Sequence, residues 1–193
     1  MSEDKTDIVL NEKENKEEIR EIDPPNKLLS AILGWLVPGL GHIYQGRYFK
    51  GFLFAFCIIP LLLVGIWMGS YREILPTNEE RLQLGRDVWF SWREGDKRLF
   101  FIPQAMIGSV AIPALIQARY VEKNGEGFCS NLFAPPRLPR EIRSSQPLLD
   151  EIILKTWSWF DLGTLFTAAA GLLNLLVIFD IIGGPSWIIQ KEE

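Results

Sequence analysis

One histidine, His42, stands directly after a break in an apolar run, and it is the only imidazole in the chain. Residues 34–54 read GWLVPGLGHIYQGRYFKGFLF, so Pro38, Gly39 and Gly41 interrupt a stretch that otherwise suits a helix. A neutral imidazole within a membrane can relay protons or bind a ligand. It can equally serve the backbone groups that such a break leaves free. We favour this structural role for His42 and keep proton or ligand handling as the alternative.

Two aspartates and an asparagine belong to the last apolar segment. Asp161 and Asp180 flank it, and Asn174 lies inside it. Ionisable groups inside a bilayer are costly and often functional. The two carboxylates are about 28 Å apart along a helix, almost the hydrocarbon thickness, so both can lie at interfaces. We expect Asp161 to cap the helix start, and His42, Asn174 and Asp180 remain candidate polar membrane groups.

Small and polar residues also recur along one face of this last segment. Gly163, Thr167, Gly171 and Asn174 follow one another at spacings of four, four and three residues, which places them on one side of a helix. Small residues let helices approach closely in lipid, and an asparagine can hydrogen-bond across the contact. The sequence predicts that this face packs on the N-terminal hairpin or on another copy. A polar substrate path along the same face is the alternative.

Signatures of enzymes, metal sites and cofactor sites are absent from the sequence. There is no glycine-rich phosphate loop and no Gly-x-Ser-x-Gly turn. Cys57 and Cys129 have no metal-ligand spacing and are expected to be free thiols. The net charge of −4 gives no reason to expect nucleic-acid binding. We therefore expect no catalytic activity, no metal and no cofactor.

Four windows without Asp, Glu, Lys or Arg are the elements that would position these residues. They cover residues 28–44, 52–69, 99–118 and 162–179. About 20 apolar residues span a bilayer as a helix, so the sequence predicts an all-α, polytopic integral membrane protein with about four transmembrane helices. The predicted order is an acidic, disordered tail (1–27), a transmembrane hairpin (28–69), a polar Trp-rich segment (70–98), a third span (99–118), a loop with an amphipathic helix (119–160), and a fourth span with the chain end (161–189).

The segment before the last span carries apolar residues at helical spacing from Leu148 to Phe160. Trp157 and Trp159 lie beside this apolar face, as is typical of membrane interfaces. We expect residues 148–160 to form a helix lying in the interface. A soluble amphipathic helix that covers its neighbours is the alternative.

The hairpin motif resembles that of a known class of small membrane proteins. Pro38, Gly39, Gly41, His42, Tyr44, Gly46 and Arg47, followed by Lys50 and Gly51, form a pattern PGLG-H-x-Y-x-G. This pattern resembles the junction of a bacterial membrane protein family of unknown function, and it is similar to the two-transmembrane-helix (TM-two) domain. The resemblance implies a helical hairpin in a membrane and no activity. We also expect Arg47 and Lys50 to reach anionic lipid head groups.

These expectations favour a non-catalytic integral membrane protein, a scaffold or an accessory subunit, in the bacterial cytoplasmic (inner) membrane. Its partner would be another membrane protein or a second copy. The alternative is a small transporter or channel component that uses His42, Asn174 and Asp180. Counting four spans puts His42 and Asp180 on opposite sides of the membrane, and this geometry favours the scaffold. Because no export signal precedes the tail, we expect cytoplasmic termini.

Overall fold

The computed structural model describes residues 26–74, 80–94, 96–138 and 146–183. This part of the chain is mostly helical, and segment 70–98, expected within an all-α fold, forms two antiparallel β-hairpins instead. Most of the acidic tail lies outside the described residues. The helices are α2 (Lys27–Leu36), α3 (Leu40–Tyr44), α4 (Tyr48–Met68), α5 (Phe101–Gln104), α6 (Gly108–Asn124), the 3-10 helix η1 (Cys129–Asn131), α7 (Leu149–Thr156) and α8 (Ser158–Gly183), and the strands are β1 (Tyr71–Ile74), β2 (Glu80–Gln83), β3 (Trp92–Arg93) and β4 (Asp96–Lys97).

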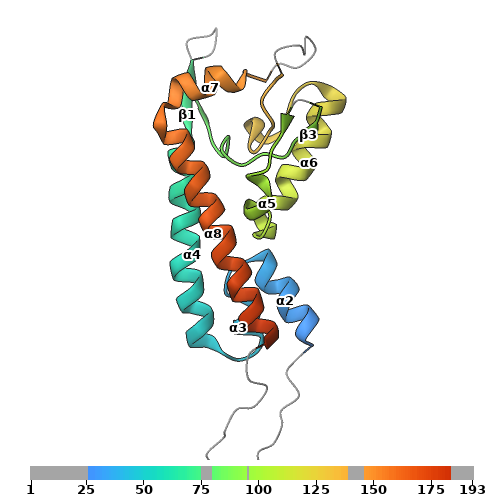
Figure 1. The fold of residues 1–193 in the computed structure, drawn as a ribbon, viewed down its shortest axis with the longest axis vertical. Helices are drawn as coiled ribbons and strands as arrows, with labels where there is room; N and C mark the ends of the chain where they lie inside the picture. Colours follow the sequence, from blue (N-terminus) through green and yellow to red (C-terminus); the bar gives the residue numbers. More distant parts are fainter. Residues whose placement is uncertain (1–25, 75–79, 95, 139–145, 184–193) are drawn as a thin grey trace, which may run out of the picture.

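Two long helices, α4 and α8, run side by side along the molecule (Figure 1). Both are long and apolar enough to cross a membrane, and among the described residues only these two are. Their contact depends on small residues, because a Cβ on Gly65 of α4 would lie 2.7 Å from the Thr167 methyl group of α8. A Cβ on Gly163 would likewise lie 2.7 Å from the Gly65 carbonyl oxygen. The predicted spans 52–69 and 162–179 are thus long helices.

The first predicted window, 28–44, is not a single helix. Helix α2 ends at Leu36, and Gly39 takes a left-handed conformation with φ of 86°. Helix α3 then folds back along α2. The two helices are so close that a Cβ on Gly41 would collide with the Ser30 carbonyl oxygen and lie 3.1 Å from Gly34 N. The chain therefore returns to the end at which α2 began (Figure 1). The expected two-span hairpin over 28–69 holds one long helix, since Pro38 cannot continue a helix and Gly39 reverses the chain.

The third predicted window, 99–118, also reverses direction. The segment from Arg98 to Met106 descends along α8: Arg98 reaches Thr164, Gln104 reaches Thr167, and Met106 reaches Asn174. The backbone leaves the helical conformation at Ile107 (φ −115°, ψ 103°), and α6 then rises again (Figure 1). The short helix α5, a break at Ile107 and the first part of α6 replace the predicted span. Its apolar composition is compatible with either path, so composition alone did not reveal the turn.

A cap of short elements closes the end of the molecule at which α4 finishes and α8 begins (Figure 1). It consists of the β1–β2 and β3–β4 hairpins, the loop around η1, and α7. The predicted interfacial helix corresponds to α7, which is shorter than expected because Trp157 has a positive φ of 53°. Helix α8 starts immediately afterwards at Ser158. Tyr71, Ile152 and Phe160 form a small apolar core beneath α7.

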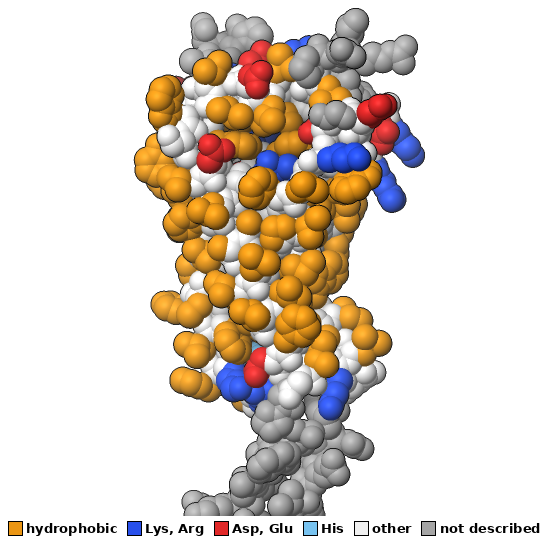
Figure 2. Space-filling model, viewed as in Figure 1, with side chains coloured by type: hydrophobic (Ala, Val, Ile, Leu, Met, Phe, Trp, Pro, Cys, Tyr) orange, Lys and Arg blue, Asp and Glu red, His pale blue; other side chains and the backbone are white. Residues whose placement is uncertain are grey.

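The face of the molecule drawn in Figure 2 has an apolar middle and charged ends. Figure 2 shows hydrophobic side chains covering the length of the molecule between the two ends, where the Lys, Arg, Asp and Glu side chains gather. Large exposed residues from both long helices belong to the apolar part, namely Phe49, Phe52, Phe56, Leu63, Leu165, Leu172, Leu176 and Phe179. Large contiguous apolar surfaces mark interaction with a membrane or another protein.

Candidate functional site

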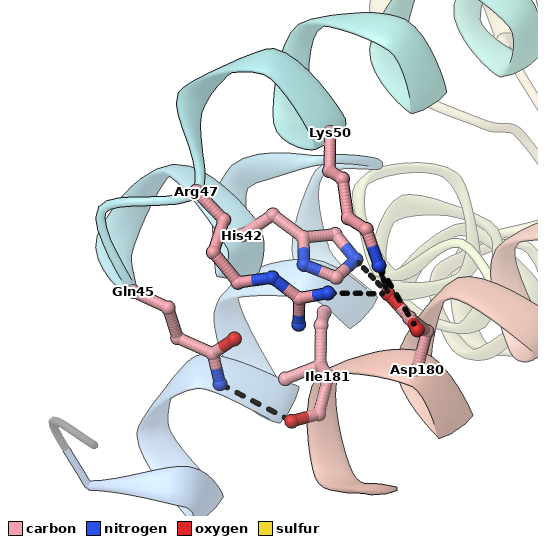
Figure 3. Close-up of polar contacts among 6 residues, drawn as sticks. All are labelled: His42, Gln45, Arg47, Lys50, Asp180 and Ile181. Atoms are coloured by element: carbon pink, nitrogen blue, oxygen red, sulfur yellow. Dashed lines mark hydrogen bonds and ion pairs between the residues drawn. The ribbon is translucent and has the colours of Figure 1, made fainter. Parts of the chain in front are cut away.

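A charged cluster gathers around Asp180 at the end of α8 that faces away from the cap (Figure 3). Oδ2 of Asp180 lies 3.3 Å from NH2 of Arg47 and 3.3 Å from Nζ of Lys50. Both cations come from the start of α4, at the N-cap position and in the first turn. The side chains of Asp180 and Lys50 are 34% and 44% exposed, whereas that of Arg47 is 17% exposed. The cluster therefore ties the start of α4 to the end of α8 and remains accessible from outside.

His42 is fully buried at the inner edge of this cluster. Its ring packs on Phe54, with ring centroids 5.1 Å apart. Nε2 lies 3.3 Å from Oδ2 of Asp180, but neither ring nitrogen has a hydrogen-bond partner of good geometry among the described residues. These surroundings differ from the hydrogen-bonded role we expected for His42.

The placement of His42 and Asp180 on opposite sides was wrong. The chain makes two long passages, along α4 and α8, because 28–44 and 99–118 each double back. The start of α4 and the end of α8 consequently lie at the same end (Figures 1 and 3). Nε2 of Gln45 donates to the Ile181 carbonyl oxygen at 3.2 Å, which satisfies one of the free carbonyls in the last turn of α8.

The remaining residues of the hairpin motif shape the backbone around this cluster. A Cβ on Gly39 would collide with the Gly51 carbonyl oxygen, so the break and the start of α4 touch through their backbones. Gly46 has a φ of 76° in the turn before α4, a conformation that glycine adopts at little cost. Pro38 is buried, whereas Tyr44 is exposed.

Asn174 joins the two breaks in the middle of α8. Its Nδ2 donates to the carbonyl oxygens of Gly34 and Met106, at 3.1 and 2.8 Å. The indole of Trp35 donates to the carbonyl oxygen of Ala105 at 2.9 Å. Side chains thus pair three carbonyls near the places where α2 and α5 end. Non-helical backbone at membrane depth needs such internal partners.

The other small residues of α8 also face inward. Thr167 accepts a hydrogen bond from Nε2 of Gln104 at 2.8 Å. Gly171 lies against the backbone of α5, where a Cβ would collide with the Pro103 carbonyl oxygen. Asp161 is exposed in the first turn of α8. The residues predicted along one face, Gly163, Thr167, Gly171 and Asn174, are all buried within this chain.

A buried carboxyl group under the cap escaped the sequence reasoning. Asp87 is fully buried, and neither carboxyl oxygen has a hydrogen-bond partner among the described residues. Burial raises the pKa of Asp87 to about 7, against smaller opposing effects that include Thr167 and the Arg98 cation. NH2 of Arg98 donates to the Asp87 carbonyl oxygen at 2.7 Å, and burial lowers the pKa of Arg98 to about 10. Both residues belong to segment 70–98, in which basic and acidic residues are equally numerous. No pattern in that segment distinguishes Asp87 and Arg98 from solvent-exposed charged residues.

The described residues contain no group of three His, Cys, Asp or Glu side chains that could hold a metal ion. Cys57 and Cys129 are free and exposed. The two sets of contacts at Asp180 and Asn174 hold chain segments together, and neither surrounds one of the cavities found among the described residues.

Comparisons with known proteins give one assignment. No curated protein and no solved structure matches the chain significantly. A family model described as "Family of unknown function (DUF6677)" matches residues 29–193, which is most of the chain. The match includes the Asp180 cluster, both breaks, the cap and the two long helices. The chain therefore belongs to this family of unknown function, DUF6677.

Proposed function

We propose that the chain is a non-catalytic integral membrane protein that crosses the bilayer twice, through α4 and α8, and serves as a scaffold or accessory subunit. The segments α2–α3 and α5–α6 enter the bilayer from opposite sides and return. This arrangement is supported by the apolar middle of the surface and the charged ends. It also gives the non-helical backbone at the two breaks a buried position. The resemblance of the hairpin motif supports a location in the bacterial cytoplasmic membrane.

One observation carries the scaffold role: the carboxylate of Asp180 and the amide nitrogen of Asn174 are paired within the chain. Asp180 is held by Arg47 and Lys50, and Asn174 by two backbone carbonyls. These contacts stabilise the architecture. Lys50, which is partly exposed, can in addition meet an anionic head group.

The cap offers a surface for a protein partner. Trp92 of β3 is 58% exposed and has the Lys97 ammonium 5.5 Å from its ring centroid. Exposed tryptophans at the centre of an interface often carry much of the binding energy. Trp157 is also exposed, but it lies at the α7–α8 corner, where we expect lipid.

Purification of the tagged chain in mild detergent, with quantification of every co-purifying protein, tests this proposal. We expect a partner, or a second copy of the chain, at a near-integral ratio. The Trp92→Ala variant should lose most of it, and the matched Trp157→Ala variant should keep it. A lone monomer, or equal loss in both variants, would contradict a scaffold that acts through the cap.

A small transporter or channel component is the second candidate, because His42 and Asp180 are 3.3 Å apart. Proton flux into liposomes that contain the purified chain separates the two functions. The transport function predicts a flux that Asp180→Asn and His42→Ala remove and that Asp150→Asn, an exposed change on α7, leaves intact. The scaffold function predicts no flux above that of empty liposomes.

A further inference from the structure

A cavity of about 820 Å³ opens where the cap meets the two long helices. Its wall includes the last turn of α4, the start of β1, the end of α7 and the beginning of α8. In a chain that crosses the bilayer through α4 and α8, these helix ends lie at the membrane interface. Its volume falls within the range of pockets that hold small organic ligands. The described lining residues are Trp67, Met68, Ser70, Tyr71, Arg72, Leu82, Lys155, Thr156 and Trp159.

The described lining combines cations with aromatic and apolar side chains. Arg72 and Lys155 are its charged members, and it contains no carboxylate. The Lys155 ammonium lies 5.3 Å from the ring centroid of Tyr71, a cation–π contact that holds the ammonium beside the cavity. Trp67 and Trp159 are both exposed and come from the helix ends, where tryptophans favour the head-group level of a bilayer. This pairing of charge and apolar surface suits an amphiphile with a negative head group.

The two cations are free enough to meet such a group. NH1 of Arg72 pairs with Oε2 of Glu80 at 3.0 Å, but the two side chains are 75% and 60% exposed. Exposed ion pairs contribute little to stability and exchange readily with other partners. Lys155 and Leu82 are also exposed, whereas Thr156 is buried and closes the wall. An entering phosphate can therefore replace Glu80 as the partner of Arg72.

We propose that this cavity binds one anionic phospholipid, with its phosphate between Arg72 and Lys155 and its upper acyl chains against Trp67, Met68 and Trp159. The inference rests on the proposed membrane function, because it requires α4 and α8 to lie in a bilayer. It is independent of the scaffold role and of any flux through the chain. The absence of a carboxylate from the described lining favours a head group with a net negative charge over a zwitterionic one.

Native mass spectrometry of the purified, delipidated full-length chain tests the site. The probes are phosphatidylglycerol, phosphatidylcholine and inorganic phosphate, each added separately. We expect one phosphatidylglycerol per chain, bound more tightly than phosphatidylcholine. The double variant Arg72→Gln/Lys155→Gln should bind phosphatidylglycerol roughly tenfold or more weakly, since each cation near an anionic surface contributes about 1 kcal/mol. The control Arg119→Gln/Lys123→Gln removes the same charge from α6 and should bind as the wild type does.

A second variant tests the cavity itself without a change of charge. Leu82→Trp places a larger side chain in the cavity and should lower phosphatidylglycerol binding. This variant still tests the site if the double variant folds poorly. Equal loss in both double variants would show diffuse surface attraction and overturn the site. Binding of inorganic phosphate alone with the same affinity would also overturn it, because the lipid part would then contribute nothing. If Cys57 reacts with an aqueous thiol reagent in native membranes, the membrane proposal itself fails. If Cys57 is shielded and no lipid is retained, only this site fails.

Discussion

Asp87 links the stability of the fold to pH. Burial raises the pKa of its carboxyl from 3.8 to about 7, so the folded chain keeps a proton that the unfolded chain releases. The contribution of Asp87 to stability is therefore present below about pH 4 and lost as the pH rises to about 7.

The Asp87→Asn variant tests this titration. It should gain stability over the wild type as the pH rises from 4 to 7, by at most about 1.4 kcal/mol for each pH unit. Unfolding in detergent at several pH values in this range measures the difference. Asp150→Asn, an exposed change on α7, is the control and should show no such trend. A difference between Asp87→Asn and the wild type that stays constant with pH would contradict the buried titration.

Asn174 supports the backbone at both breaks, so its removal should be costly. Asn174→Leu leaves the carbonyl oxygens of Gly34 and Met106 without their side-chain donor in a buried region. We expect a loss of roughly 2–4 kcal/mol in the free energy of unfolding, since each unpaired buried group costs about 1–3 kcal/mol. Asn124→Leu is the control, because Asn124 is exposed and bonds only to its own helix at Tyr120. A loss of equal size in the control would argue against the bridging role of Asn174.

At the scale of elements, α8 can approach α5 because Gly171 has no side chain. In Gly171→Ala, the added methyl group meets the Pro103 carbonyl oxygen, so the two helices must move apart. We expect a loss of roughly 1–3 kcal/mol in stability. Gly183→Ala, at the end of the same helix, meets nothing within 4 Å and should be neutral or stabilising. Thermal unfolding of both variants checks this, and destabilisation by both would refute the close-approach argument.

The long helices were predictable from sequence, whereas the paths of the two broken windows were not. An uninterrupted apolar run of bilayer length, such as that of α4, has few structural alternatives. Windows 28–44 and 99–118 also lack Asp, Glu, Lys and Arg, but the lack of charge does not tell whether a chain passes through or returns. Pro38 and Gly39 mark the first break in the sequence. The reversal after α5 is less visible, since Pro103 is also compatible with a bent span.

At the scale of the whole molecule, the number of passages decides which residues meet. The motif residues His42, Arg47 and Lys50 were recognisable in the sequence, and so was Asp180. Their meeting depends on an even number of passages between His42 and Asp180. Three were expected, along 52–69, 99–118 and 162–179, but window 99–118 doubles back, so two remain. Asp87 and Arg98 were missed for a related reason. Only the docking of the cap onto α4 and α8 buries them, and local sequence carries little information about such long-range contacts.

An arrangement with two membrane passages predicts which residues are accessible from each side of the membrane. This prediction differs from that of four spans. With two passages, residues 80–94 and the loop at Cys129 lie on the same side of the membrane, and Asn26 lies on the other. With four spans, residues 70–98 share the side of the N-terminus, and Cys129 lies opposite. The native thiol of Cys129 is exposed in the cap, whereas that of Cys57 lies on the apolar surface of α4.

Sealed membrane vesicles of one orientation, treated with a membrane-impermeant maleimide, distinguish these arrangements. Cys129 and Glu94→Cys should react from the same side, and Asn26→Cys only from the other, each substitution being made in a Cys129→Ser background. Cys57 should stay unreacted until the chain is denatured, since a maleimide needs the thiolate in water. Reaction of Glu94→Cys from the side of Asn26→Cys would restore the four-span arrangement. The four-span arrangement would also put the start of α4 and the end of α8 on opposite sides of the membrane. The Asp180 cluster contradicts this, because Arg47 and Lys50 hold the start of α4 against the end of α8.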